Sequence, residues 1–156
     1  MISNTINQMK LFGHNELLLN LKYLFDNNKL PNKILFSGQK GIGKCTLSYH
    51  FVNYILSIKE DLPYDFKNFE INKNNKSYKL LCNNTHPNFF QIKLKKDKKN
   101  IDISQVREMI SFTNKSSFDN SYKIIIIDNL EYLNSSSSSA LLKVIEEPND
   151  KVLFFL

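Results

Sequence analysis

Residues 38–45 read Gly-Gln-Lys-Gly-Ile-Gly-Lys-Cys and constrain the fold of this chain more than any other segment. An apolar run at 34–36 precedes them, and apolar residues at helical spacing follow up to residue 58. This order predicts a strand, a glycine-rich loop and a helix. Glycines let backbone N–H groups close around phosphate oxygens, and the helix N-terminus adds partial positive charge. The segment therefore predicts a phosphate-binding loop.

The segment fits the P-loop pattern G-x-x-x-x-G-K-[ST] at every position but the last. We expect Lys44 to reach the outer phosphates of ATP. Cys45 stands where a hydroxyl normally binds Mg²⁺, and a soft thiol suits that hard ion poorly, so we expect Mg²⁺ to bind weakly or not at all. Thr46 could replace the hydroxyl in part, one residue out of register. The predicted nucleotide-binding residues are Gly38, Gly41, Ile42, Gly43, Lys44, Cys45 and Thr46. The alternative is a vestigial loop kept for its fold.

Strands and helices alternate along the rest of the chain. The expected strands cover 34–36, 89–94, 124–127 and 152–156, and the expected helices cover 15–27, 45–58, 103–112 and 140–147. Four isoleucines at 124–127 predict a central parallel strand that is buried on both faces. Asn15 is the expected N-cap of the first helix, and Asp102 or Ser104 that of the third. The alternation predicts an α/β fold, a parallel sheet with helices on both faces.

Two segments break this pattern. Residues 60–88 are rich in Asn, Lys and aromatic residues with weak periodicity, so we expect an irregular insertion there. Residues 134–139 form a polar, serine-rich stretch ahead of the last helix. Asp128 directly follows the isoleucine run, as a strand-end ligand of Mg²⁺ would. The simpler alternative is an aspartate that caps a turn.

Composition narrows the class of protein. The formal net charge is +6, which is compatible with contact to nucleic acid. Arg107 is the only arginine, and the abundance of Lys, Asn and Ile indicates an AT-rich coding sequence, so we discount the charge as evidence of DNA binding. Two cysteines cannot form a disulfide framework, and His14, His50 and His86 show no metal-ligand spacing. No apolar run approaches the roughly 18–20 residues of a membrane span, and no secretory signal begins the chain. We expect a cytoplasmic protein without a membrane partner.

Five segments together resemble the N-terminal part of bacterial clamp-loader AAA+ subunits, above all the delta-prime subunit of DNA polymerase III. They are residues 12–15, 29–38, 85–88, 101–107 and 139–148. The last, Ser-Ala-Leu-Leu-Lys-Val-Ile-Glu-Glu-Pro, is the most specific and is similar to the NALLKxLEEP helix of delta-prime and gamma/tau subunits. The resemblance covers nearly the whole chain and is weakest at 60–84.

The resemblance implies one AAA+ nucleotide-binding domain over residues 1–156. It implies the sheet order 5-1-4-3-2, truncated here before the fifth strand, with the lid and collar domains absent. The edge of the strand at 34–36 would then be bare, and we expect this chain to be poorly soluble or oligomeric. The implied partners are the delta and gamma/tau subunits and, through the complex, the sliding clamp and primed DNA.

The departures from the family pattern favour the delta-prime type. Hydrolysing subunits place a glutamate after the strand-end aspartate, whereas this chain has Asn129, which can orient water but cannot accept its proton. Glu131 is expected on the far side of the turn. No catalytic residue is assigned, and hydrolysis by this chain alone is not expected. Three functions stay open: a delta-prime subunit with an ATP-binding or vestigial loop that assists clamp loading in DNA replication, an active gamma/tau-type ATPase, and a nucleotide-free scaffold.

Overall fold

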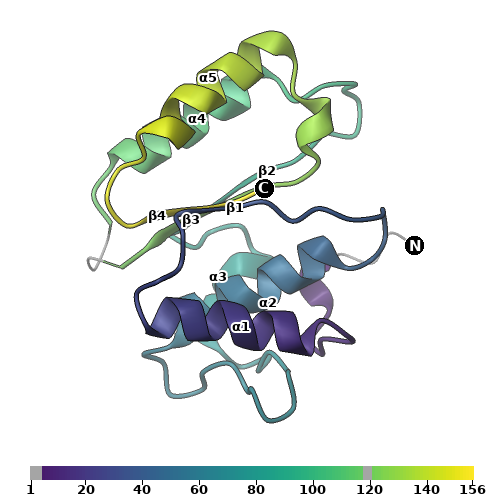
Figure 1. Cartoon of the computed structure of the whole chain (residues 1–156), viewed down its shortest axis with the longest axis vertical. Coiled ribbons are helices and arrows are strands. Elements are labelled where there is room, and N and C mark those ends of the chain that lie inside the picture. Colours follow the sequence, from purple (N-terminus) through teal and green to yellow (C-terminus); the bar gives the residue numbers. More distant parts are fainter. Residues whose placement is uncertain (1–4, 118–120) are drawn as a thin grey trace. The chain divides into compact units, whose positions relative to one another are not determined.

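The computed structural model describes residues 5–117 and 121–156, which form five α-helices and a four-stranded parallel sheet (Figure 1). The chain divides into two compact units. The first consists of the residues up to Leu30 together with Ser37–His86, and the second of Pro31–Phe36 together with Pro87–Leu156. No helix in the described residues is long and apolar enough to cross a bilayer.

The second unit holds the sheet, which consists of β1 (Lys33–Ile34), β2 (Phe89–Ile92), β3 (Lys123–Ile127) and β4 (Val152–Phe155). All neighbours are parallel in the order β1-β4-β3-β2, which matches four strands of the order that the family resemblance implies. In register, Ile125 lies between Phe90 and Phe154. All five residues of β3 are buried, so the isoleucine run is the central strand that the sequence predicts.

Two helices of this unit, α4 (Ile103–Asn114) and α5 (Ser135–Glu146), lie side by side over one face of the sheet (Figure 1). Each contributes an apolar stripe to a core shared with the strands. Its buried members are Ile92, Ile101, Val106, Met109, Ile125, Ile127, Leu141, Val152 and Phe154. Burying one such side chain contributes about 1.5–3 kcal/mol, so this cluster holds the sheet and both helices together. Helices on the other face stay a prediction.

The serine-rich stretch is helical, contrary to the expectation that the last helix begins near residue 140. Asn134 is the N-cap of α5, and its side-chain oxygen accepts a bond from the Ser137 N–H at 2.8 Å. Ser137 is fully buried, and its hydroxyl donates to the Ile101 carbonyl at 2.9 Å. Local hydrogen bonds therefore offset the low helix propensity of serine.

The first unit contains a short 3₁₀ helix, η1 (Thr5–Asn7), and three α-helices, α1 (Asn15–Asp26), α2 (Lys44–Ser57) and α3 (Lys76–Cys82). The middle helix is buried around most of its circumference, because α1, α3 and η1 all contact it. Its buried residues are Leu47, Ser48, Tyr49, His50, Phe51, Val52, Asn53, Tyr54, Ile55 and Ser57. The helix that follows the glycine loop is thus the core of this unit.

Residues 60–88 are expected to be an irregular insertion with little regular structure, and the structure has one short helix in this segment, α3. Its periodicity is weak, but its first turn is capped twice. The Asn75 side chain accepts from the Tyr78 N–H at 2.7 Å, and the Glu60 carboxylate accepts from the N–H groups of Lys76 and Ser77 at 2.8 and 3.0 Å. A carboxylate at a helix N-terminus is favourable for its charge as well as its bonds.

The predicted N-cap is wrong for α1 and confirmed in position for α4. Asn15 is the first residue of α1 rather than its N-cap, and that position belongs to His14. His14 has a left-handed backbone, with φ 58°, and its side chain makes no capping bond. Asp102 does occupy the N-cap of α4, but without a bond from its side chain.

Candidate phosphate-binding loop

The glycine loop connects the end of the β1 segment to the start of α2, as the sequence predicts, although β1 itself ends at Ile34. Residues 38–42 are exposed. Gly41 and Gly43 have φ angles of 85° and 98°, a region that side chains with a Cβ seldom adopt. The structure thus gives a physical reason for glycine at two of the predicted site positions.

The N-terminus of α2 opens onto this loop. Gly43 is its N-cap, and this residue has no side chain with which to cap the first turn. The first N–H groups of a helix have no partner within the helix and carry partial positive charge. Lys44, Cys45 and Thr46 are the first three residues of α2, and all are half-buried. The N-terminus of α2 can therefore bind an anion. The rest of α2 is buried, and this packing fixes the position of its N-terminus.

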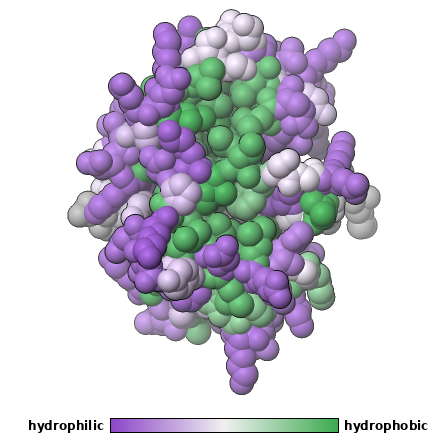
Figure 2. Space-filling view, viewed as in Figure 1, coloured by the Kyte–Doolittle hydropathy of each residue, from purple (hydrophilic) through white to green (hydrophobic). Residues whose placement is uncertain are grey.

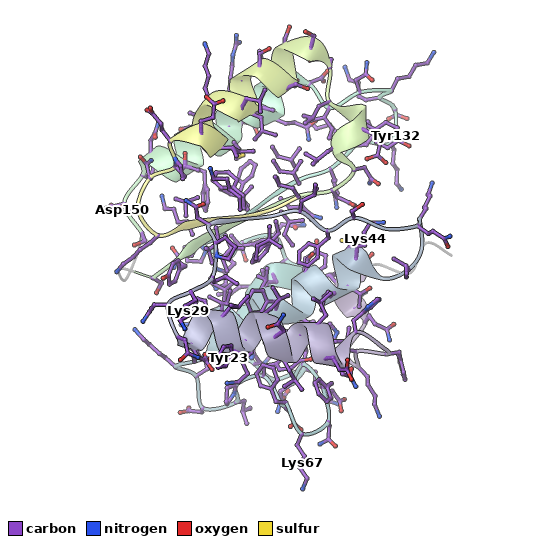
Figure 3. The ribbon with its side chains drawn as sticks, viewed as in Figure 1. Tyr23, Lys29, Lys44, Lys67, Tyr132 and Asp150 are labelled. Carbon is purple, nitrogen blue, oxygen red and sulfur yellow. The ribbon has the colours of Figure 1, made fainter. Side chains whose placement is uncertain are left out.

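Lys44 folds back onto the loop. It projects from the first turn of α2 (Figure 3), and its Nζ donates to the carbonyl oxygens of Gly38 at 2.7 Å and Gln39 at 3.0 Å. The ammonium group is therefore held at the loop by two backbone acceptors. A phosphate that binds here would replace these carbonyls as the acceptor of the Lys44 ammonium group, because charge-assisted bonds to a phosphate are stronger than bonds to neutral oxygens.

His14 also contacts the loop, a feature that the sequence analysis missed. Its Nε2 lies 2.7 Å from the Ile42 carbonyl oxygen. A carbonyl can only accept, so Nε2 carries the proton. Two ring atoms also lie 3.7 Å from the position that a Cβ on Gly43 would take. His14 and Ile42 are 28 residues apart, and no spacing rule in the sequence connects them.

Asp128 lies in the second unit, directly after β3, and is half-buried. Its backbone N–H donates to the Ile92 carbonyl at 2.9 Å, which extends the pairing of β3 with β2. The loop belongs to the first unit, so joint Mg²⁺ binding by Asp128 and the loop stays a prediction. Within the described residues, no group of three or more His, Cys, Asp or Glu side chains is placed to hold a metal ion.

Asn129 follows Asp128 with a left-handed backbone, φ 63°, and precedes a short 3₁₀ helix, η2 (Leu130–Tyr132). Its side chain is exposed, and so is that of Glu131 within η2. Asparagine tolerates this backbone conformation better than most residues. The position directly after Asp128 thus holds an amide instead of a carboxylate, on a backbone that suits asparagine.

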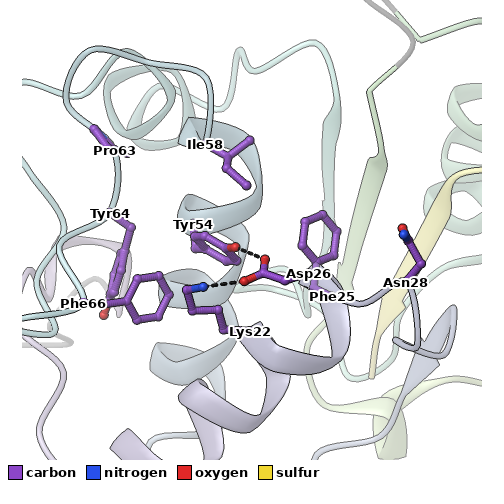
Figure 4. Close-up of a pocket in the computed structure, with 9 residues that line it drawn as sticks. All are labelled: Lys22, Phe25, Asp26, Asn28, Tyr54, Ile58, Pro63, Tyr64 and Phe66. Atoms are coloured by element: carbon purple, nitrogen blue, oxygen red, sulfur yellow. Dashed lines mark hydrogen bonds and ion pairs between the residues drawn. The ribbon is translucent and has the colours of Figure 1, made fainter.

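A separate cavity of about 680 Å³ in the first unit is lined by residues of α1, α2 and the segment 63–66 (Figure 4). Lys22 forms an ion pair with Asp26, and the Tyr54 hydroxyl donates to the same carboxylate. The Lys22 ammonium also lies 5.3 Å from the centroid of the Phe66 ring. Burial raises the pKa of Asp26, but these two bonds outweigh burial and hold the pKa below its usual range. The polar groups that line this cavity bond to one another, so we interpret the cavity as a structural feature of this unit rather than as a ligand site.

Comparison with known proteins identifies the family. A family model described as "DNA polymerase III, delta subunit" matches residues 13–156. The chain belongs to the delta-prime and gamma/tau family of DNA polymerase III clamp-loader subunits. The match includes the glycine loop and Asp128, and it covers all but the first residue of the five segments on which the resemblance rests.

Individual relatives carry both names of the family. The chain is 27% identical over 122 residues to DNA polymerase III subunit delta' of Pseudomonas aeruginosa, and 30% identical over 133 residues to subunit delta' of Buchnera aphidicola subsp. Schizaphis graminum. These matches cover 78% and 85% of this chain but only 35% and 38% of the relatives. It is also 28% identical over 149 residues to subunit gamma/tau of Mycoplasma genitalium, covering 96% of this chain and 24% of that protein.

A solved structure shows the same fold. The gamma subunit-related protein of Thermotoga maritima superimposes with a TM-score of 0.60 at 20% sequence identity. The superposition covers 89% of this chain and 38% of that chain. At this identity the likeness concerns the fold alone.

Proposed function

We propose that this chain acts as a delta-prime-type subunit of the DNA polymerase III clamp loader, and that its P-loop binds ATP without hydrolysing it. The observation that carries the proposal is Asn129 after the strand-end Asp128. Two of the three relatives described above are named delta'. The role would be structural within an assembly that loads the sliding clamp onto primed DNA.

The absence of hydrolysis follows from the acid–base chemistry. Attack on the γ-phosphate needs a group that orients water and draws off its proton. The Asn129 amide can do the first but cannot accept a proton. The carboxylate of Glu131 is exposed within η2, two residues further on. The residue directly after Asp128 is therefore not a base.

Two features support the binding of ATP. Lys44 and the first turn of α2, whose N-cap is a glycine, both favour an anion. Cys45 replaces the hydroxyl that would complete the Mg²⁺ site, so we expect affinity for ATP to depend little on Mg²⁺. The partners in this proposal are the delta and gamma/tau subunits, in the cytoplasm.

The test is a titration of a fluorescent ATP analogue into the purified chain, with and without Mg²⁺. We expect similar Kd values in both conditions, and a loss of at least about tenfold on Lys44→Ala, because a charge-assisted bond contributes about 1.5–3 kcal/mol. Lys40→Ala is the matched control, since this exposed lysine lies in the same loop. Cys45→Thr should make binding tighter when Mg²⁺ is present.

Each alternative function predicts a different result. No binding at millimolar ATP would favour a nucleotide-free scaffold and would contradict the proposal that the P-loop binds ATP. An active gamma/tau-type ATPase would show itself in the assembled clamp loader. There, ATP turnover would vanish when Lys44→Ala is introduced into this subunit alone.

A further inference from the structure

We propose that His14 is a positioning residue for the phosphate-binding loop, because its imidazole fixes the peptide group between Ile42 and Gly43 so that the Gly43 N–H points toward the bound phosphate. This inference rests on the proposed nucleotide binding. It adds a residue outside the P-loop pattern, from the turn that precedes α1.

The geometry begins with one hydrogen bond. The His14 Nε2–H donates to the Ile42 carbonyl oxygen at 2.7 Å. The described chain contains no cis peptide bond, so the N–H of Gly43 lies in the same peptide plane as the Ile42 carbonyl and points in the opposite direction. A bond that fixes the carbonyl direction therefore also fixes the direction of the N–H.

This peptide group needs such a restraint. Gly41 and Gly43 flank Ile42 and leave the backbone on both sides free to rotate. The Ile42 N–H makes only a long bond, 3.4 Å, to the Gln39 carbonyl, and the Ile42 side chain is 51% exposed. Packing therefore contributes little to the orientation of the peptide.

His14 is itself held firmly. Its carbonyl accepts a bond from the Leu18 N–H at 2.9 Å at the start of α1, and Leu18 is fully buried. The backbone of His14 is left-handed, with φ 58°, which is uncommon for a residue with a full side chain. The His14 side chain makes no capping bond to α1 in this conformation. We therefore infer that the left-handed backbone is kept for the hydrogen bond to the loop.

A purely structural staple between α1 and the loop is the competing interpretation. The two differ in what restores function. A staple would be preserved by any ring that fills the same space, whereas a positioning role needs a donor at the place of Nε2. Glutamine carries an N–H donor at a similar distance from the backbone, while phenylalanine keeps the ring and has no donor.

The experiment compares His14→Phe, His14→Gln and the exposed control Tyr23→Ser on α1. The Kd of the fluorescent ATP analogue should rise about five- to tenfold for His14→Phe, as expected when one well-placed hydrogen bond is lost. His14→Gln and Tyr23→Ser should stay within about twofold of wild type. Thermal unfolding checks that each variant is folded, and His14→Asn, whose amide is too short to reach, replaces His14→Phe if the latter does not fold.

Two results would overturn the inference while the proposed function stands: unchanged affinity in His14→Phe, or an equal loss in His14→Gln and His14→Phe. If the wild type binds no ATP, both the proposed function and this inference fail.

Discussion

Acid should destabilise the first unit through His50. This side chain is fully buried in α2. Its Nε2–H donates to the Gln8 carbonyl at 2.9 Å, and its Nδ1 accepts from the Tyr64 hydroxyl at 2.8 Å. Burial disfavours the charged imidazolium and lowers the pKa of His50 from 6.5 to about 4, although the bond to Gln8 opposes this effect.

The pKa difference sets the size of the effect. The unfolded chain binds the proton of His50 near pH 6.5 and the folded chain only near pH 4. The full stability is therefore present above pH 6.5 and is lost as the pH falls from 6.5 to 4. Each pKa unit corresponds to about 1.36 kcal/mol, so the full loss is about 3 kcal/mol, of which about 2 kcal/mol appears between pH 7 and pH 5.

Urea denaturation at pH 7, 6 and 5, followed by circular dichroism, measures this loss. His50→Gln should be less stable at pH 7, because it disturbs a buried hydrogen-bonded group, but its free energy of unfolding should change less between pH 7 and pH 5. Leu142→Ala, which changes an exposed side chain that does not titrate, is the control and should keep the wild-type dependence on pH. If wild type and His50→Gln lose the same free energy between pH 7 and pH 5, the reasoning is refuted.

Three further predictions concern stability and association. Phe154→Ala should lower the free energy of unfolding by about 3–5 kcal/mol in urea, because Phe154 is fully buried in β4. Lys123→Met should cost about 1–3 kcal/mol in the same assay, because the buried Lys123 ammonium donates to the Phe112 and Lys115 carbonyls at the end of α4. The 156-residue chain should self-associate in size-exclusion chromatography with light scattering, and Leu35→Lys should reduce this association. Leu35 is 66% exposed beside β1, which is an edge strand in the described sheet, and Figure 2 shows apolar surface exposed on one face of the molecule.

Matched controls separate these effects from general damage. Leu142→Ala removes a leucine that is 56% exposed, and Lys95→Met removes an exposed lysine, so each should change the free energy of unfolding by less than about 0.5 kcal/mol. An equal loss in Leu142→Ala and Phe154→Ala would contradict the core assignment. A wild-type chain that is monomeric at high concentration would contradict the edge-strand argument.

The sheet could be predicted because its buried strands are short apolar runs that can be recognised in the sequence. The four isoleucines before Asp128 have no polar alternation, and they form the central strand. α3 could not be predicted in this way, because the Glu60 carboxylate that caps it lies 16 residues before Lys76. The start of α5 was predicted too late for a related reason. Ser137 is helical and buried, and its hydroxyl bonds to the Ile101 carbonyl, 36 residues away in the sequence.

The candidate site was predictable in its composition but not in its contacts. The pattern from Gly38 to Lys44 placed the loop and the start of α2 correctly. It could not show that Lys44 bonds to the loop carbonyls, because the spacing of residues does not fix the direction of a long side chain. The contact of His14 depends on a left-handed residue before α1, which the sequence does not mark, since histidine is not a residue that demands that conformation.

The backbone at Asn129 sets the cost of placing a carboxylate directly after Asp128 by a single substitution. The φ angle of 63° suits asparagine, whereas glutamate in the same conformation would cost on the order of 1 kcal/mol. A single Asn129→Glu substitution would therefore place a carboxylate on a backbone that resists it. A change in the turn that leads into η2 would offset this cost, so a carboxylate at this position is better tolerated together with a different turn.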